Sequence, residues 1–176
     1  MALRNSELWF EEGPEQLLEP EESYVATIKT EHGDIVMELY NDTAPVNVNS
    51  FAFLAEKGWY KDSSFHRVLP GFVAQGGDPT GTGIGFPGYK CGDEVVSSRS
   101  FDEAGYVSFA NSGPNSNGGQ FFITLDETTN LNDGFTIIGR VIEGQDVVES
   151  ITPRDPQTGA DLSLGDKIIN VTVEKK

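Results

Sequence analysis

The sequence predicts a mainly β fold, a closed antiparallel β-barrel with two α-helices, and three observations carry this prediction. Many short runs rich in β-branched and aromatic residues are separated by Gly, Pro, Asn and Asp. Only two segments have helical spacing, so strands and helices do not alternate as they do in a doubly wound parallel sheet. With 176 residues, 37% of them hydrophobic, the chain can bury one core and is too short for two.

An acidic, proline-punctuated extension over residues 1–22 precedes the domain, which we place at residues 23–176. Strand-like alternation begins at Tyr24. We expect deletion of the extension to leave fold and activity intact, because little core would be lost. Two apolar patches, Leu8–Phe10 and Leu17–Leu18, are the reason for doubt, since they could dock onto the barrel.

A hairpin and then a helix open the domain. The alternating residues of YVATIKTEHGDIVMELY flank Gly33-Asp34, which predicts a turn there. In APVNVNSFAFLAEKGWY, Pro45 near the start and Gly58 near the end bound a predicted helix. Four of its residues have spacings that fit one buried face: Val46, Phe51, Leu54 and Ala55.

Six further strand candidates follow the helix. They are SSFHRVLP, FVAQGG, YVSFAN, QFFITL, FTIIGRVI and KIINVTVEK, each bounded by turn residues. A second short helix candidate, GQDVVESI, lies between the last two. Because side chains fill the interior of such a barrel, a functional site must lie on its outer wall or at a rim.

The net charge of −16 argues against nucleic acid and anionic membranes as partners, since both attract clusters of Lys and Arg. No apolar run approaches the roughly 18 residues that a membrane span requires. The first residues lack the basic start and apolar centre of a signal peptide. We therefore expect a cytoplasmic monomer, with an exported protein whose leader has been removed as the alternative.

Few residues suit nucleophilic or metal chemistry. A single cysteine, Cys91, excludes an internal disulfide, and two histidines, His32 and His66, are too few for a Cys/His zinc site. No G-x-S-x-G motif is present, and His66 should point away from the face of its neighbour Arg67. We interpret His66 as a barrel histidine with local hydrogen bonds, and we expect neither a metal nor a cofactor.

Two polar or glycine-rich stretches are interpreted as loops. The run from Gly77 to Tyr89 has neither the lysine nor the strand-to-helix context of a phosphate-binding loop. The neighbouring carboxylates of Asp93 and Glu94 suggest a solvated edge rather than an acid/base pair.

One arginine stands among apolar residues in FHRVLPGFVAQGGDP. On a strand, Arg67 shares its face with Phe65 and Leu69, and beyond a proline-glycine break Val73 and Gln75 form a second same-face pair. Gln75 can accept one hydrogen bond of a partly buried guanidinium while the other N–H groups stay free for a ligand carbonyl. The alternative is an arginine tied only into hydrogen bonds of the barrel.

A second informative stretch is VSFANSGPNSNGGQFFITL. One strand candidate ends at Ala110-Asn111 and another starts at Gln120, with a turn rich in Asn, Gly, Ser and Pro between them. This arrangement should place the backbone of Ala110 and Asn111 near the ring of Phe121 or Phe122.

Three segments, FHRVLPGFVAQGGDPTGTG, FANSGPNSNGGQFFITL and DGFTIIGRVIEGQDVVESI, closely resemble signature segments of the cyclophilin-type peptidyl-prolyl cis-trans isomerases. The resemblance extends over about Tyr24 to Glu174, in the order and spacing of that family. It implies an eight-stranded antiparallel closed barrel capped by two helices, with the site in a groove on the outer face.

By position, Arg67 resembles the catalytic arginine of the family and Gln75 the glutamine that steadies it. Gly81 and Thr82 resemble part of a loop beside a neighbouring subsite. The resemblance assigns the proline pocket to Phe72, Val73, Phe122 and Leu131, and peptide-backbone binding to Ala110, Asn111 and Gln120.

Three positions depart from the usual family pattern. Val73 replaces a commoner methionine, Asn130 stands where many members carry tryptophan, and Phe135 stands where many carry histidine. The rim of the pocket, to which we assign Phe135, should therefore differ in shape and polarity.

The resemblance implies catalysis of rotation about X-Pro peptide bonds, assisting protein folding. Proline-containing peptides and unfolded or folded client proteins are the implied partners, with weak binding of the cyclic peptide cyclosporin. The alternative is a proline-peptide binding module or a chaperone with little turnover. Such a binder needs the pocket but not the cation, so Arg67 and Gln75 favour the enzyme.

Overall fold

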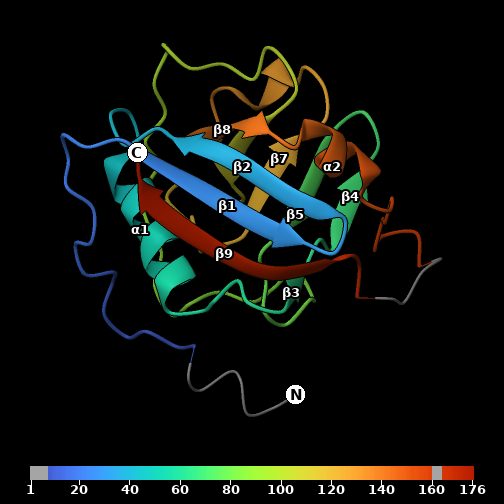
Figure 1. Cartoon of the computed structure of the whole chain (residues 1–176), viewed down its shortest axis with the longest axis horizontal. Coiled ribbons are helices and arrows are strands. Elements are labelled where there is room, and N and C mark those ends of the chain that lie inside the picture. Colours follow the sequence, from blue (N-terminus) through green and yellow to red (C-terminus); the bar gives the residue numbers. More distant parts are fainter. Residues whose placement is uncertain (1–7, 160–163) are drawn as a thin grey trace.

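The computed structural model describes residues 8–159 and 164–176. Its centre is one curled antiparallel sheet with the strand order β3-β9-β1-β2-β8-β6-β7-β5-β4, which confirms the expected mainly β fold with two helices (Figure 1). The strands are β1 (Tyr24–Thr30), β2 (Gly33–Leu39), β3 (Ser63–Ser64), β4 (Arg67–Leu69), β5 (Val73–Gly76), β6 (Tyr106–Phe109), β7 (Phe121–Thr124), β8 (Ile137–Glu143) and β9 (Lys167–Lys175). The helices are α1 (Pro45–Glu56), α2 (Gln145–Ser150) and the 3-10 turn η1 (Thr129–Leu131).

The sheet has nine strands where eight were expected, because the candidate SSFHRVLP splits in two. Its first part, β3, pairs with β9, whereas its second part, β4, pairs with β5. Between them the Phe65 amide donates to the carbonyl of Asp166, and the Phe65 ring is buried. The two edges of the sheet are thus consecutive pieces of one segment, and an isolated bridge between Ser64 and Asp78 joins them again.

The first hairpin forms as predicted, but its turn comes earlier. Thr30 pairs with Gly33, so Glu31 and His32 make the turn and Gly33 already belongs to β2. The Thr30 hydroxyl donates to the carbonyl of Gly33 and accepts from the amide of His32. Gly33 has φ of +139°, a value that other residues rarely adopt, which explains why glycine starts this strand.

Helix α1 buries most of one side against the sheet. Phe51, Leu54 and Ala55 lie in the core as expected, but Val46 is 54% exposed. The reason lies at the start of the helix, where the Glu94 carboxylate accepts hydrogen bonds from the amides of Val46 and Asn47. Glu94 therefore satisfies N–H groups that the helix cannot, and the interpretation of this residue as a solvated edge was wrong.

The extension does not hang free of the domain. Figure 1 shows it running as an irregular segment along α1. The side-chain oxygen of Asn49 in α1 accepts hydrogen bonds from the amides of Leu17 and Leu18, and its amide nitrogen donates to the carbonyl of Glu15. Leu18 is buried in the main core. The expectation that the extension contributes little core is therefore contradicted for the described residues.

Replacing Leu18 by alanine should lower the free energy of unfolding by about 2 to 4 kcal/mol, because a buried leucine leaves a cavity that closes only in part. Urea unfolding followed by fluorescence measures the change. Leu164, which is exposed, supplies the matched control, and Leu164→Ala should shift stability by less than about 0.5 kcal/mol. Equal effects of the two substitutions would show that the extension is not docked in solution.

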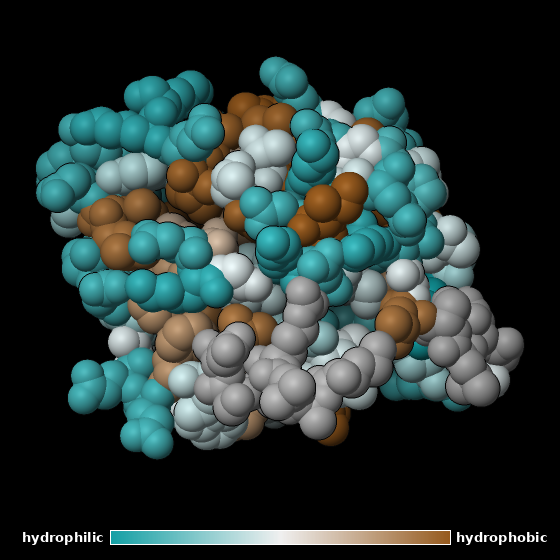
Figure 2. Space-filling view, turned by 60° about the horizontal axis from the view of Figure 1, so that its bottom comes forward, coloured by the Kyte–Doolittle hydropathy of each residue, from teal (hydrophilic) through white to brown (hydrophobic). Residues whose placement is uncertain are grey.

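No helix in the described part of the chain is both long and apolar enough to cross a membrane. Figure 2 shows a surface dominated by hydrophilic side chains, with apolar side chains gathered in separate areas between them. Such areas on an otherwise charged surface indicate where ligands or other chain segments bind.

Candidate functional site

A row of directly opposed residues crosses the outer face of the sheet. Arg67 of β4 pairs with Gln75 of β5, which in turn pairs with Phe122 of β7. Opposed residues share a face and lie roughly 5 Å apart, so the cation, the amide and the ring are neighbours. Phe65 was expected on this face but lies in the main core, because the strand breaks between Phe65 and Arg67.

The guanidinium of Arg67 is half-buried and has few partners. Its Nη1 lies 3.5 Å from Oε1 of Gln75, a long hydrogen bond. Within the described part of the chain, this is its only hydrogen bond, and no carboxylate forms an ion pair with it. The alternative of an arginine fully engaged by the barrel is therefore not what the structure shows. N–H groups of the guanidinium remain available to a ligand.

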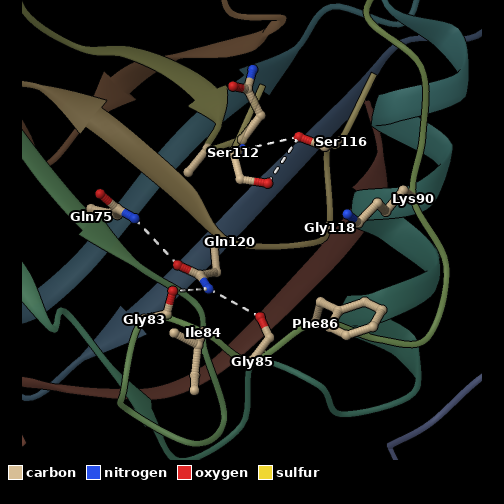
Figure 3. Close-up of a pocket in the computed structure, with 12 residues that line it drawn as sticks. Gln75, Gly83, Ile84, Gly85, Phe86, Lys90, Ser112, Ser116, Gly118 and Gln120 are labelled. Atoms are coloured by element: carbon tan, nitrogen blue, oxygen red, sulfur yellow. Dashed lines mark hydrogen bonds between the residues drawn. The ribbon is translucent and has the colours of Figure 1, made fainter. Parts of the chain in front are cut away.

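Two glutamines link this row to a neighbouring loop. The side-chain nitrogen of Gln75 donates to Oε1 of Gln120 at 3.2 Å. The side-chain nitrogen of Gln120 donates to the carbonyls of Gly83 and Gly85 at 2.9 and 3.0 Å (Figure 3). The orientation of Gln75, and with it the position of its oxygen near Arg67, thus depends on the loop around residues 83–85.

A buried carboxylate holds that loop in place. Asp78 accepts hydrogen bonds from the amides of Thr80, Gly83 and Gly85, and from the hydroxyl of Thr80. Burial alone would raise the pKa of Asp78, but these hydrogen bonds outweigh it and hold the pKa below its usual value. Gly85 has no room for a side chain, since a Cβ there would overlap the Asp78 carboxylate.

An apolar surface lies on the same face as Arg67. Val73 and Phe122 are buried in a second hydrophobic cluster, separate from the main core. The rings of Phe122 and Phe135 meet edge to face, with centroids 5.5 Å apart. The partly buried members of the cluster include the other residues assigned to this surface, Phe72, Leu131 and Phe135, together with Ala110.

A cavity of about 340 Å³ adjoins Gln75. It brings together the three residues assigned to peptide-backbone binding, Ala110, Asn111 and Gln120, with a wall from the loop at residues 83–86. Gly81 and Thr82 do not line it: Gly81 lines a cavity beside β3, and Thr82 lines a groove on the other side of Ile84. The structure therefore brings together ten of the twelve candidate residues in the row, the apolar surface and the cavity.

Several contributors had no clear signal in the sequence. Tyr40, Phe101, Tyr106 and Ile137 complete the apolar cluster, and each comes from a different part of the chain. The Arg99 guanidinium stacks over the ring of Tyr40 at 3.5 Å. Residues 92–105 contain no regular element, so periodicity could not show that Phe101 points inward.

His66 lies beside Arg67 in sequence but does not share its environment. It is buried, and neither of its ring nitrogens has a hydrogen-bond partner in the described part of the chain, so the expected local hydrogen bonds were wrong. Burial lowers the pKa of His66, which favours the neutral ring. One group of described residues, Glu31, His32 and Asp166, could present metal-ligand atoms within 4.8 Å of one another, and none of them lines the cavity beside Gln75.

Comparison with known proteins gives a consistent result. The family model described as cyclophilin type peptidyl-prolyl cis-trans isomerase/CLD matches residues 25–173. Peptidyl-prolyl cis-trans isomerase-like 1 of Emericella nidulans is 47% identical over 126 residues, which cover 70% of this chain and 78% of the relative. Probable peptidyl-prolyl cis-trans isomerase A of Mycobacterium bovis is 44% identical over 144 residues, covering 72% and 79%.

The fold is similar to that of a solved enzyme. The crystal structure of a Cryptosporidium parvum cyclophilin type peptidyl-prolyl cis-trans isomerase in the presence of the dipeptide Ala-Pro superposes with a TM-score of 0.76 and 32% identity. The match covers 86% of this chain and 99% of that chain. With the family model spanning the whole sheet and the groove, this chain belongs to the cyclophilin-type peptidyl-prolyl cis-trans isomerases.

Proposed function

We propose that this isomerase rotates X-Pro peptide bonds with Arg67 as its catalytic residue and Gln75 as the residue that positions it. The single observation that carries this assignment is a half-buried guanidinium beside an apolar surface, with only one long hydrogen bond among the described residues. A cation in such a place costs free energy unless a ligand uses it, so its presence favours a role in the reaction.

The chemistry follows from the amide bond. Rotation of an X-Pro bond is slow because twisting destroys amide resonance, with a barrier of roughly 18 to 20 kcal/mol. In the twisted state the prolyl nitrogen becomes pyramidal and gains a lone pair. A guanidinium directed at that nitrogen, or at the adjacent carbonyl oxygen, stabilises the twisted state more than the planar one. No covalent bond is made or broken, so neither a nucleophile nor a base is required.

The remaining residues confine the rotation to one bond. The apolar surface around Phe122 holds the proline ring, and the backbone near Ala110 and Asn111 fixes the residues on one side of it. The Asn111 side chain donates to the carbonyl of Gly134, which ties this strand end to the loop after η1. One charge-assisted hydrogen bond in such a site could lower the barrier by about 3 to 4 kcal/mol, some hundredfold in rate.

The substrates we propose are proline-containing segments of unfolded or folded client proteins. The open apolar surface and the adjoining cavity suit an extended chain rather than a small compact ligand. The acidic charge of −16 disfavours acidic client segments. A binding module without turnover would use the same surface, but it would gain nothing from an arginine with free N–H groups.

A protease-coupled assay on an X-Pro tetrapeptide separates the enzyme from the binding module. We expect the protein to accelerate the slow cis-to-trans phase catalytically, at concentrations far below that of the peptide. Acceleration only when protein and peptide are equimolar, or no acceleration while the peptide still binds, would show a binder and contradict the proposal.

A further inference from the structure

A second groove, of about 430 Å³, continues from the cavity beside Gln75. The two share the wall formed by Ile84, Gly85 and Phe86, so this groove lies directly across that wall. We call it the outer groove. Its lining is Leu8, Trp9, Trp59, Thr80, Thr82, Ile84, Gly85 and Phe86, and thus includes two residues of the N-terminal extension.

The extension and the loop that it meets fit one another closely. The Phe10 amide donates to the carbonyl of Pro87 at 2.8 Å. The Trp9 and Phe86 rings meet edge to face, with centroids 5.2 Å apart. Gly88 has φ of +99°, and a Cβ there would lie 2.7 Å from the carbonyl oxygen of Phe10. Only glycine lets the extension approach this loop so closely, so the Trp9 wall is a built part of the groove.

The opposite side of the outer groove is rigid. Trp59 is almost fully buried, and its indole N–H donates to the carbonyl of Gly77 at 2.8 Å. Thr80, at the base of the loop, is held by hydrogen bonds to Asp78. The outer groove therefore lies between a fixed core residue and the docked extension, and a ligand there would meet preformed walls.

The rim of the outer groove is unusually apolar for an acidic protein. Trp9 is 50% exposed, Ile84 is 84% exposed and Phe86 is 41% exposed. Three large apolar side chains around one groove favour burial against an apolar side chain of a ligand. Aromatic residues are also enriched where polypeptides bind.

We propose that the outer groove is an additional subsite of this isomerase, which binds an apolar side chain of the same polypeptide whose proline occupies the apolar surface around Phe122. The occupant follows from continuity: a chain extended past Gln75 fills the first cavity and then crosses the wall at Ile84–Phe86. Trp9 is the specificity-determining residue of this subsite. The inference rests on the proposed function, because it assumes that the proline binds beside Arg67.

The test uses a short X-Pro tetrapeptide and longer peptides that carry a single leucine, placed in turn at successive positions on either side of the proline. Matched peptides carry glycine in place of that leucine. The measured quantity is the ratio of kcat/KM for the leucine peptide to kcat/KM for its glycine partner, obtained by NMR exchange. We expect one position to give a ratio of about ten, equivalent to about 1.4 kcal/mol.

Trp9→Ala should bring this ratio close to one, whereas Val46→Ala, which removes an exposed apolar side chain on α1, should keep it near ten. No position with a ratio above two, or an unchanged ratio in Trp9→Ala, would overturn the proposal. Failure of the tetrapeptide itself to be isomerised would instead overturn the proposed function, so the two failures are distinguishable.

A second readout does not depend on turnover. The chain has two tryptophans, Trp9 and Trp59, so its NMR spectrum contains two indole N–H signals. Saturation with the favoured leucine peptide should shift the Trp9 signal, which Trp9→Ala identifies by its loss. The glycine partner should leave that signal in place. A Trp9 signal that responds equally to both peptides, or to neither, would contradict the subsite.

Discussion

Replacing Arg67 by alanine should lower isomerase turnover by about 10- to 1000-fold, because the substitution removes a charge-assisted hydrogen bond that forms fully only in the twisted state. The change should affect stability little, since Arg67 is half-buried and its only hydrogen bond among the described residues is the long one to Gln75. The protease-coupled assay measures turnover, and urea unfolding measures stability.

Arg140 supplies the matched control. It also lies on a strand and is half-buried, but it forms an ion pair with Glu103 at 2.7 Å and lines none of the grooves described above. Arg140→Ala should therefore leave turnover within about twofold of the unmodified protein. If Arg67→Ala folds and keeps near-normal turnover, Arg67 is not catalytic.

Cyclosporin should inhibit this protein weakly, by one to two orders of magnitude less than family members that carry tryptophan at the position of Asn130. There an indole N–H donates a hydrogen bond while the ring covers apolar surface. Asn130 is exposed in η1, beside Leu131 of the apolar cluster. Lost apolar contact at roughly 25 cal/mol per Å², with a misplaced hydrogen bond, amounts to about 2 to 3 kcal/mol.

Asn130→Trp should restore about 10- to 100-fold in cyclosporin affinity while changing tetrapeptide turnover much less, because a small peptide need not touch the rim. A titration of cyclosporin against isomerase activity in both proteins measures this difference. Low-nanomolar inhibition of the unmodified protein, or no gain in Asn130→Trp, would show that the rim at this position does not limit binding.

Strand alternation and turn chemistry were sufficient to predict the centre of the site. Gly71 has φ of +70°, and this tight turn between β4 and β5 places Arg67 opposite Gln75. Alternation failed at Phe65, because the chain passes there from one edge of the sheet to the other and the faces of the strand reverse. A local pattern cannot show such a crossing.

Long-range contacts account for the rest of what the sequence did not predict. The loop around residues 83–85 depends on a single carboxylate, Asp78, whose partners have no periodic spacing. The docking of Leu17 and Leu18 on Asn49 joins residues more than 30 positions apart. These features depend on the folded sheet and helix, so composition indicated the extension but not its place.

The central claim is that Arg67 stabilises the twisted bond and not the bound peptide. NMR exchange on a saturated X-Pro peptide measures the cis–trans rate on the enzyme, and a titration of the same sample measures Kd. In Arg67→Ala we predict that the rate of exchange in the complex falls about 10- to 1000-fold while Kd changes less than about threefold. An unchanged exchange rate in the complex, with Kd weakened enough to explain the loss of turnover, would contradict the account.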